Sequence, residues 1–350
     1  MKALVYHGRN DVRHESVADP RVAAGEVLLK VKYAGLCHTD INEYRHGPLF
    51  VAKSPHPRTG RCMPIVLGHE FSGEVIEVGA EVSNIKVGDR VAVNAVDFCG
   101  ECAYCKTRAV NLCSSVAFIG FGRDGGFAEL ASVPARCCFH LSPSLSYRAG
   151  ALVEPLSVAL HAVKRAGMVI GSRVAVIGGG AVGLCVLQAL RATGAGQVMV
   201  IDTSPSKEVF AKRMGATSFL DPSVDDFEVL VREITAGGVD VAFECVGSEG
   251  SLHTAFSVTR AGGTICLVGI FPMPIEFDFN IPVMREHSVI CSLGYTDEFP
   301  AVINMLSDGR LQAEPLITRI LALAESVDLG IRRYQEPGVT NVRTLISMES

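Results

Sequence analysis

The stretch that decides the fold reads RVAVIGGGAVG and runs from Arg173 to Gly183. Its first five residues form an apolar, β-rich run, which predicts a buried strand over 173–177. Gly178, Gly180 and Gly183 follow in the spacing Gly-x-Gly-x-x-Gly, where a helix is expected to begin. Glycine lets the backbone turn tightly and approach a pyrophosphate, whose charge then lies at the free N–H groups of a helix N-terminus. The stretch therefore predicts a dinucleotide-binding turn; the alternative is a tight strand–helix turn that binds nothing.

An acidic residue lies where the next strand is expected to end. Asp202, nineteen residues after Gly183, can accept hydrogen bonds from a ribose 2′-hydroxyl, and its charge would repel a 2′-phosphate. No arginine follows immediately, which favours NAD over NADP. Lys207 is a candidate contact of the adenosine ribose, although a solvated lysine in a first helical turn fits nearly as well. Val182 and Val246 complete the residues that we expect to bind the cofactor.

Strands alternate with helices throughout the segment after Glu154. The expected strands are 173–177, 197–202, 218–220, 239–244, 263–268 and 288–293, and the expected helices are 157–165, 182–193, 206–214, 227–235 and 250–259. Six strands joined by right-handed crossovers make a doubly wound parallel sheet, the Rossmann arrangement. We therefore expect a six-stranded α/β domain over 154–294.

The rest of the chain is richer in β segments. From residue 1 to about 150, short strands are separated by turn residues, which favours an antiparallel, barrel-like layout. The stretch 1–7 reads as an edge strand, and a helix over 299–308 and a strand over 342–346 follow the Rossmann segment. A chain of 350 residues is long enough for two domains. We expect the second domain to combine 1–153 with 295–350.

Four cysteines lie within fifteen residues, in the pattern Cys-x2-Cys-x2-Cys-x7-Cys: Cys99, Cys102, Cys105 and Cys113. Thiolates at such spacing can converge on one tetrahedral ion, and a closed four-sulfur site suits zinc. An iron–sulfur run would have a shorter last gap followed by proline, and a disulfide pair would need an oxidising compartment. We predict a structural zinc loop over 97–114. Because such a closed site does no chemistry, an open catalytic site is expected elsewhere.

Composition excludes several classes of function. The net charge is −5 and no basic stripe with interleaved aromatic residues is present, which argues against nucleic acid as a partner. The apolar stretch 174–190 is interrupted by glycines and fits a strand, turn and helix better than a membrane span. The N-terminus is too short and too polar for a secretory signal. We expect a cytoplasmic protein, with six further thiols read most simply as buried small hydrophobes: Cys62, Cys137, Cys138, Cys185, Cys266 and Cys291.

Candidates for an open metal site lie outside the cysteine quartet. Cys37, His69 and Glu154 have the side chains that a catalytic zinc with one open position uses. Each also has an ordinary interpretation: Cys37 as a core thiol, His69 as a hydrogen-bonded core histidine, and Glu154 as a carboxylate favoured at a helix N-terminus. Spacing along the sequence does not show whether they converge.

Four motifs occur in a fixed order along the chain: Gly68-His69-Glu70, the cysteine quartet, Gly178–Gly183, and Asn341-Val342-Arg343-Thr344. In this order they resemble the zinc-dependent medium-chain alcohol dehydrogenases, over essentially the whole length of the chain. Two stretches, 47–73 and 152–161, resemble the (R,R)-2,3-butanediol dehydrogenases in particular. The second stretch is shared with sorbitol and other polyol dehydrogenases, whereas the first, an insertion ahead of the histidine, discriminates better.

The resemblance implies a GroES-like catalytic domain that is interrupted by the Rossmann domain. Cys37, His69 and Glu154 match the positions of the catalytic zinc ligands, and Glu70 is similar to a second acidic residue that enters the coordination sphere or helps ligand exchange. Whether Glu154 binds zinc directly or through a water varies in such families, so both alternatives stay open. The resemblance implies two zinc ions per subunit, one catalytic and one structural, together with NAD.

The resemblance also assigns roles around the reacting atoms. Thr39 matches the hydroxyl that relays the substrate proton, although a turn hydroxyl bonded to local backbone is an alternative. Arg343 matches an arginine that holds the cofactor pyrophosphate, a task that suits a guanidinium fork. Many relatives carry a histidine five residues after the zinc cysteine, where this chain has Asn42. Since an amide does not titrate, the relay must end through water or another group, and the candidates are His38, Glu43 and His46.

The expected function is that of a zinc-dependent oxidoreductase that transfers hydride between NAD and a small vicinal diol, converting 2,3-butanediol to acetoin and the reverse. By this hypothesis zinc lowers the pKa of the substrate hydroxyl. The alternative is a dehydrogenase of sorbitol, another polyol or a polyol phosphate, and a third reading is a catalytically idle dinucleotide sensor. We expect a homo-oligomer, a tetramer or a dimer, in which 290–295 could join sheets between subunits.

Overall fold

The computed structural model describes residues 1–167, 170–334 and 341–349. They form two compact units, one made of Met1–Glu154, Tyr295–Gly309 and Ile317–Ser350, the other of Pro155–Gly294 and Arg310–Leu316. The expected domain boundaries differ from these units at two places: Glu154 lies in the first unit and residues 310–316 lie in the second. The domain assignment remains a prediction. Residues 335–340 and 350, which belong to the expected range 295–350, lie outside the described residues.

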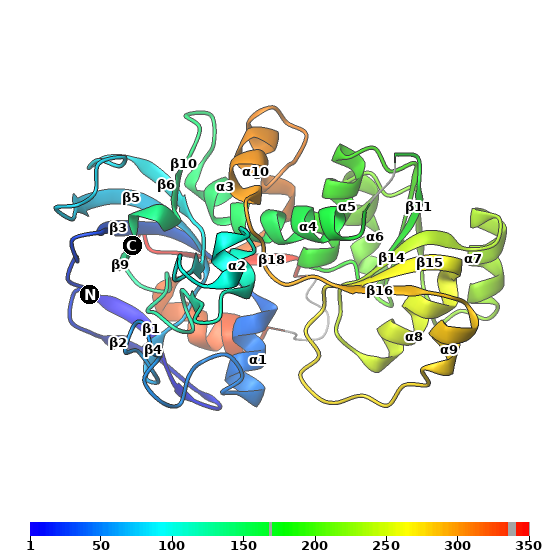
Figure 1. The fold of residues 1–350 in the computed structure, drawn as a ribbon, viewed down its shortest axis with the longest axis horizontal. Helices are drawn as coiled ribbons and strands as arrows, with labels where there is room; N and C mark the ends of the chain where they lie inside the picture. Colours follow the sequence, from blue (N-terminus) through cyan, green and yellow to red (C-terminus); the bar gives the residue numbers. More distant parts are fainter. Residues whose placement is uncertain (168–169, 335–340, 350) are drawn as a thin grey trace. The chain divides into compact units, whose positions relative to one another are not determined.

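A six-stranded parallel sheet forms the second unit (Figure 1). Its strand order is β13-β12-β11-β14-β15-β16. β11, which comes first along the sequence, lies in the middle of the sheet, and the strands that follow it are added first on one side and then on the other. The predicted α/β fold class, with a Rossmann sheet, is confirmed. The strands are β11 (Arg173–Ile177), β12 (Gln197–Ile201), β13 (Ser218–Leu220), β14 (Val239–Glu244), β15 (Thr259–Leu267) and β16 (Ser288–Cys291).

Helices cover both faces of this sheet, because its strands are apolar on both sides. Ala175 and Ile177 pack in one core cluster with Val231 of α7 and Phe256 of α8. Val176, which points to the opposite face, is also fully buried. The helices of this segment are α4 (Val153–Arg165), α5 (Ala181–Ala192), α6 (Glu208–Arg213), α7 (Phe227–Thr235), α8 (Glu249–Val258) and α9 (Asn280–Met284), with a 3-10 turn at Pro205–Lys207.

The first unit is built on β-sheets. Its main sheet has the order β10-β6-β5-β3-β18-β17, with β9 also paired to β3, and only β17 and β18 run parallel. Two small sheets, β2-β1-β4 and β7-β8, complete it. The strands are β1 (Lys2–Gly8), β2 (Asp11–Ser16), β3 (Glu26–Leu36), β4 (Ile65–Val66), β5 (Glu70–Val78), β6 (Arg90–Val93), β7 (Val96–Asp97), β8 (Ala117–Phe118), β9 (Leu130–Pro134), β10 (Cys138–His140), β17 (Ile317–Ala322) and β18 (Arg343–Ser347).

The helices of the first unit are short and lie in its connections. Its α-helices are α1 (His38–His46), α2 (Ala103–Lys106), α3 (Tyr147–Ala151) and α10 (Glu298–Ser307). Single turns of 3-10 helix occur at Val110–Leu112, Ala135–Cys137 and Leu323–Glu325 here and at Glu314–Leu316 in the other unit, and a π-helix spans Ser326–Arg332.

The prediction of an edge strand at the N-terminus is wrong. β1 is the central strand of its sheet, because β4 pairs with Val5 and Tyr6 on the side opposite to β2. A strand of only two residues, placed after a long insertion, has no periodicity that a sequence pattern can reveal.

The prediction for the six further thiols is only partly correct. Cys137, Cys138, Cys185 and Cys266 are buried, whereas Cys62 is half-buried and Cys291 is exposed. Cys291 ends β16, which is an edge strand of the parallel sheet, so one flank has no neighbouring strand to cover it.

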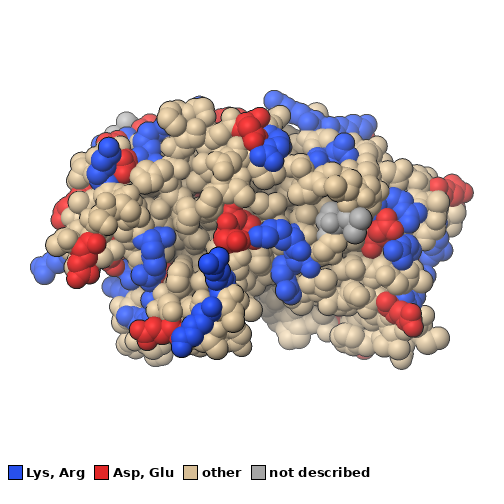
Figure 2. Space-filling model, turned by 45° about the horizontal axis from the view of Figure 1, so that its top comes forward, with Lys and Arg blue, Asp and Glu red and all other residues tan. Residues whose placement is uncertain are grey.

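The apolar character of the helices and the distribution of surface charge bear on the membrane and nucleic-acid-binding classes that the sequence argued against. Among the described residues, no helix has the length and apolar character that a membrane span requires. On the face shown in Figure 2, basic and acidic side chains are interspersed and no single-sign stripe dominates.

Candidate metal centres and dinucleotide site

The end of β3 and the start of α1 place Cys37. It is the N-cap residue of α1, and Asp40, three residues later, accepts a hydrogen bond from the backbone N–H of Cys37 at 3.0 Å. This capping arrangement fixes the backbone that carries the thiol. The Thr39 hydroxyl lies 3.5 Å from the Cys37 sulfur, and its expected role in a proton relay remains a prediction.

Asp40 also faces His69. Asp40 Oδ1 lies 3.4 Å from His69 Nδ1, neither atom has a hydrogen-bond partner among the described residues, and the carboxylate is fully buried. Burial alone would lower the pKa of His69, but the charge of Asp40 and contacts with Cys37 raise that pKa well above its ordinary value. A carboxylate behind an imidazole fixes the ring and leaves its other nitrogen toward a metal. Sequence reasoning missed Asp40, although an acidic residue three positions after a helix N-cap is a recognisable signal.

Cys37, His69 and Glu70 converge. One ligand atom from each lies within 4.8 Å of the others. Glu70 Oε1 accepts from Arg343 Nη1 at 2.9 Å, while Glu70 Oε2 is buried and has no hydrogen-bond partner among the described residues. Sulfur, imidazole and carboxylate are the donor set of a catalytic zinc, and a cation would compensate the buried negative charge. The residues therefore fit a zinc ion.

Glu154, the fourth predicted ligand, lies outside that set of three. Its carboxyl is buried, and burial, followed by the charge of Glu70, raises its pKa to about 8. Tyr295 hydrogen-bonds to Glu154, and its hydroxyl also accepts from the backbone N–H of Ala95 at 2.9 Å. Tyr295 was not predicted, since no local pattern marks a tyrosine 141 positions away along the sequence as a partner of Glu154.

Arg343 is almost fully buried and also donates to the Leu36 carbonyl at 3.2 Å. Its salt bridge to Glu70 is an interaction that the sequence did not indicate. The expected contact with a pyrophosphate remains a prediction.

The candidates for the end of a proton relay differ in their surroundings. Asn42 is buried, and His46 is exposed at the last residue of α1. His38 is exposed and lies against the Tyr334 ring, with 5.7 Å between ring centroids. Glu43 is fully buried and both of its carboxylate oxygens accept backbone N–H groups, which favours a structural role for it.

The four clustered cysteines surround one point. The Cys105 sulfur lies 3.9 Å from that of Cys99 and 3.6 Å from that of Cys102, and one sulfur from each of the four lies within 4.8 Å of the others. Four thiolates at about 2.3 Å from a zinc ion are about 3.8 Å apart, so the cluster has the right size. Backbone hydrogen bonds from Ser114 and Cys105 lower the pKa of Cys102 to about 5, whereas burial raises the pKa of Cys105 to about 12, so without a cation the cluster favours the thiolate at Cys102 and the thiol at Cys105.

A buried charge cluster holds the base of this loop. Asp97 is fully buried and pairs with Arg58 at 2.8 Å, Arg123 at 3.3 Å and Arg136. Arg58 also donates to the Phe98 carbonyl at 3.0 Å. The loop is therefore anchored to the insertion that contains Arg58 as well as to the sheet.

The glycine-rich turn after β11 has the close approaches that its motif predicts. Gly178 has φ of +101°, and a Cβ there would lie 2.7 Å from Val246 Cγ2, while a Cβ on Gly183 would overlap the carbonyl oxygen of Gly178. Gly180 is the N-cap residue of α5, and Val182 lies in its first turn. Only glycine fits at 178 and 183, because any side chain would push the strand and helix apart.

Asp202 stabilises the glycine-rich turn after β11 through hydrogen bonds. Its Oδ2 accepts from the Gly179 backbone N–H at 2.7 Å and from Lys207 Nζ at 2.9 Å, and its Oδ1 accepts from the Ser204 N–H at 2.8 Å. Lys207 is thus paired with Asp202 rather than simply solvated. The expected roles of both residues toward a ribose remain predictions.

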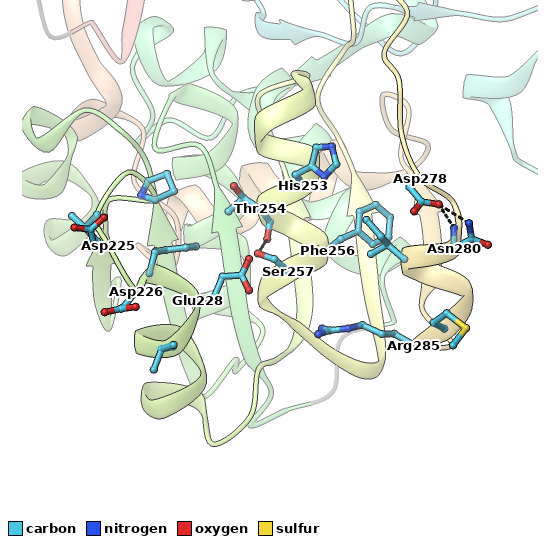
Figure 3. A pocket seen from close by; sticks show the side chains of 16 residues that line it. Asp225, Asp226, Glu228, His253, Thr254, Phe256, Ser257, Asp278, Asn280 and Arg285 are labelled. Carbon is cyan, nitrogen blue, oxygen red and sulfur yellow. Dashed lines mark hydrogen bonds between the residues drawn. The ribbon is translucent and has the colours of Figure 1, made fainter.

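A separate hollow lies in the parallel-sheet unit (Figure 3). It has a volume of about 1010 Å³ and is lined by parts of 222–229, 253–257 and 278–285. Figure 3 shows Asp278 hydrogen-bonded to Asn280 and Thr254 to Ser257, so these polar groups satisfy one another. None of the predicted metal or cofactor residues lines it.

Comparison with known families covers most of the chain. The family described as "Alcohol dehydrogenase GroES-like domain" matches residues 23–143, and "Zinc-binding dehydrogenase" matches residues 181–308. An (R,R)-butanediol dehydrogenase of Bacillus subtilis is 40% identical over 94% of this chain and 95% of its own, and a sorbitol dehydrogenase of the same organism is 34% identical over 96% and 94%.

Solved structures agree with these matches. The crystal structure of the Bacillus subtilis 2R,3R-butanediol dehydrogenase has a TM-score of 0.91 and 38% identity, covering 99% of both chains. A zinc-binding dehydrogenase of Sinorhizobium meliloti 1021, solved bound to NADP, has a TM-score of 0.88 and 30% identity, covering 99% of this chain and 98% of its own.

For the structural cluster, we predict that Cys105→Ser lowers the zinc content by about one equivalent and lowers the melting temperature, because a hydroxyl is a poor zinc ligand and a structural ion contributes folding energy. Metal analysis and thermal unfolding measure both. Cys62→Ser, outside both metal clusters, is the matched control. An unchanged zinc content in Cys105→Ser would contradict the prediction.

For the site around Cys37, we predict that Asp40→Asn weakens zinc binding by about 10- to 100-fold, because the imidazole of His69 loses its anionic partner. Competition with a chelator measures the affinity. Asp328→Asn, an exposed carboxylate with an ordinary helix-surface pairing, should leave it unchanged. Equal affinities for the wild type and Asp40→Asn would show that the carboxylate does not orient the ligand.

Proposed function

This chain belongs to the zinc-dependent medium-chain alcohol dehydrogenases and is an oxidoreductase, and from that premise we propose that it transfers hydride between NAD and a small vicinal diol, interconverting 2,3-butanediol and acetoin. The observation that carries the proposal is the similarity to a butanediol dehydrogenase, at 40% identity, over nearly the full length of both chains. The convergence of Cys37, His69 and Glu70 also supports the proposal, because these three side chains could bind the zinc ion that such a reaction uses.

The chain supplies the groups that this reaction needs. A zinc ion bound by Cys37 and His69, with an acidic residue, would act as a Lewis acid that makes an alcohol easier to deprotonate. The buried Asp40 carboxylate faces His69 at 3.4 Å, and Arg343 forms a salt bridge with Glu70. The Thr39 hydroxyl, 3.5 Å from the Cys37 sulfur, can accept the proton of the alcohol and pass it on. Glu70 and Glu154 are both candidates for the third ligand.

We propose NAD rather than NADP as the cofactor. Asp202 directly follows β12 and is buried, so its charge disfavours a 2′-phosphate at that position. Lys207 offsets part of that charge through its ion pair with Asp202. One similar structure was solved bound to NADP and another complexed with NADH, so the fold accommodates either cofactor.

Sorbitol or another polyol is the second candidate substrate, since sorbitol dehydrogenases are 33–34% identical and match over similar lengths. We further propose a homo-oligomer that works in the cytoplasm. The exposed apolar side chain of Val289 on the edge strand β16 supports a contact between copies there.

We predict that the purified enzyme reduces NAD with 2,3-butanediol at a kcat/KM at least about tenfold higher than with sorbitol, and about tenfold higher with NAD than with NADP. NADH absorbance measured with each butanediol stereoisomer, sorbitol and a sorbitol phosphate tests the substrate. A preference for sorbitol would replace the proposal by its alternative, and no turnover of any diol or polyol would contradict both.

A further inference from the structure

A buried carboxylate ends β14, beside the glycine-rich turn of the parallel-sheet unit. Glu244 is the register partner of Ile177, the residue directly before Gly178, so it lies next to the point where the strand order reverses. The side chain is fully buried, and its Oε2 has no hydrogen-bond partner among the described residues. Because burial of an unpartnered carboxylate oxygen is costly, we expect a role for Glu244 beyond packing.

Glu244 joins the two loops that follow β14 and β15. Its Oε1 accepts from the Val246 and Gly247 backbone N–H groups, each at 2.8 Å. Its backbone carbonyl accepts from the Val268 N–H at 2.9 Å and the Gly269 N–H at 3.0 Å. The two loops are in close contact, since a Cβ on Gly269 would overlap the Gly247 nitrogen. Hydrogen bonds to a charged acceptor are the stronger kind, so the carboxylate has a fixed place between these loops.

These loops lie where the nicotinamide half of a dinucleotide is expected. A dinucleotide binds across the carboxyl ends of the strands, at the point where their order reverses. Asp202 follows β12 on one side of β11, and Glu244 ends β14 on the other side. An adenosine ribose at Asp202 and a pyrophosphate at the glycine-rich turn would direct the nicotinamide half toward Glu244. Val246, a predicted cofactor contact that is exposed, lies on the loop that Glu244 holds.

We propose that the negative charge of Glu244 makes the site prefer the oxidised form of the cofactor. The inference rests on the proposed function, since it takes a nicotinamide dinucleotide as the ligand. The nicotinamide ring carries a positive charge in NAD and none in NADH, so a buried carboxylate beside it stabilises bound NAD more than bound NADH. The interaction is stronger in the interior than in water, because the effective dielectric constant is lower. Glu244 acts through its charge and touches none of the reacting atoms.

The test compares the dissociation constants of NAD and NADH. Glu244→Gln removes the charge and keeps a carbonyl oxygen that can accept both loop N–H groups. We expect this substitution to raise the ratio of the NAD to the NADH dissociation constant at least about fivefold. Titration with fluorescent NADH gives one constant, and displacement of NADH by NAD gives the other. A merely structural role would weaken both cofactors equally, and an unchanged ratio overturns the proposal.

Two further variants separate the buried charge from other effects. Glu249→Gln is the matched control, because it removes the same charge from an exposed residue in the first turn of α8, and it should change the ratio less than about twofold. Glu244→Asp keeps the buried charge and should also change the ratio less than about twofold. A rise in either variant as large as that in Glu244→Gln would refute the proposal.

The two proposals fail separately. A wild type that binds NADP and NADPH in place of NAD and NADH ends the choice of NAD, and the same ratio measured with that pair still judges Glu244. A preference for sorbitol over butanediol ends the substrate assignment and has no bearing on the ratio. A protein that binds neither pair of cofactors refutes both proposals.

Discussion

Buried negative charge is the constraint on which the site depends. Asp40 and Glu70 lie in the interior around one histidine and one arginine, next to the thiol of Cys37, and Glu154, whose pKa burial and the charge of Glu70 raise to about 8, is buried close to them. Carboxylates are costly to bury unless they are paired. Arg343 supplies part of the compensation through its salt bridge to Glu70, whose Oε2 has no hydrogen-bond partner among the described residues. A divalent cation completes this balance, and the chemistry that it brings follows from the same arrangement.

Carboxylates that accept backbone N–H groups recur wherever a functional loop must be held. Asp40 holds the N–H of Cys37, Glu43 holds three amides of the 47–51 turn, and Asp202 holds Gly179. Glu244 does the same for Val246 and Gly247, with two bonds of 2.8 Å. Each carboxylate replaces regular secondary structure at the point where the backbone leaves a strand or helix. The loops can therefore carry catalytic and binding side chains without being long or loosely packed.

The sequence predicted most of the parallel-sheet unit, because its signals are local. The strands 173–177, 218–220 and 239–244 were predicted with the bounds that the structure has, and the glycine turn lies where its spacing indicated. Strand order around β1 was not predictable, since β4 is two residues long. The metal candidates could be proposed one by one, but residues as distant along the chain as Cys37, His69 and Arg343 meet only through the pairing of β3, β5 and β18. Asp40 had a local signal, whereas Tyr295 had none.

The most direct test of the central claim is anomalous diffraction at the zinc absorption edge from crystals of the wild-type protein and of Cys37→Ala. The account predicts two anomalous peaks per subunit in the wild type, one among the four clustered cysteines and one bounded by Cys37, His69 and an acidic side chain. In Cys37→Ala only the first peak should remain, with dehydrogenase activity lost. A wild-type crystal, grown with zinc present, that shows no peak beside Cys37 and His69 would contradict the account.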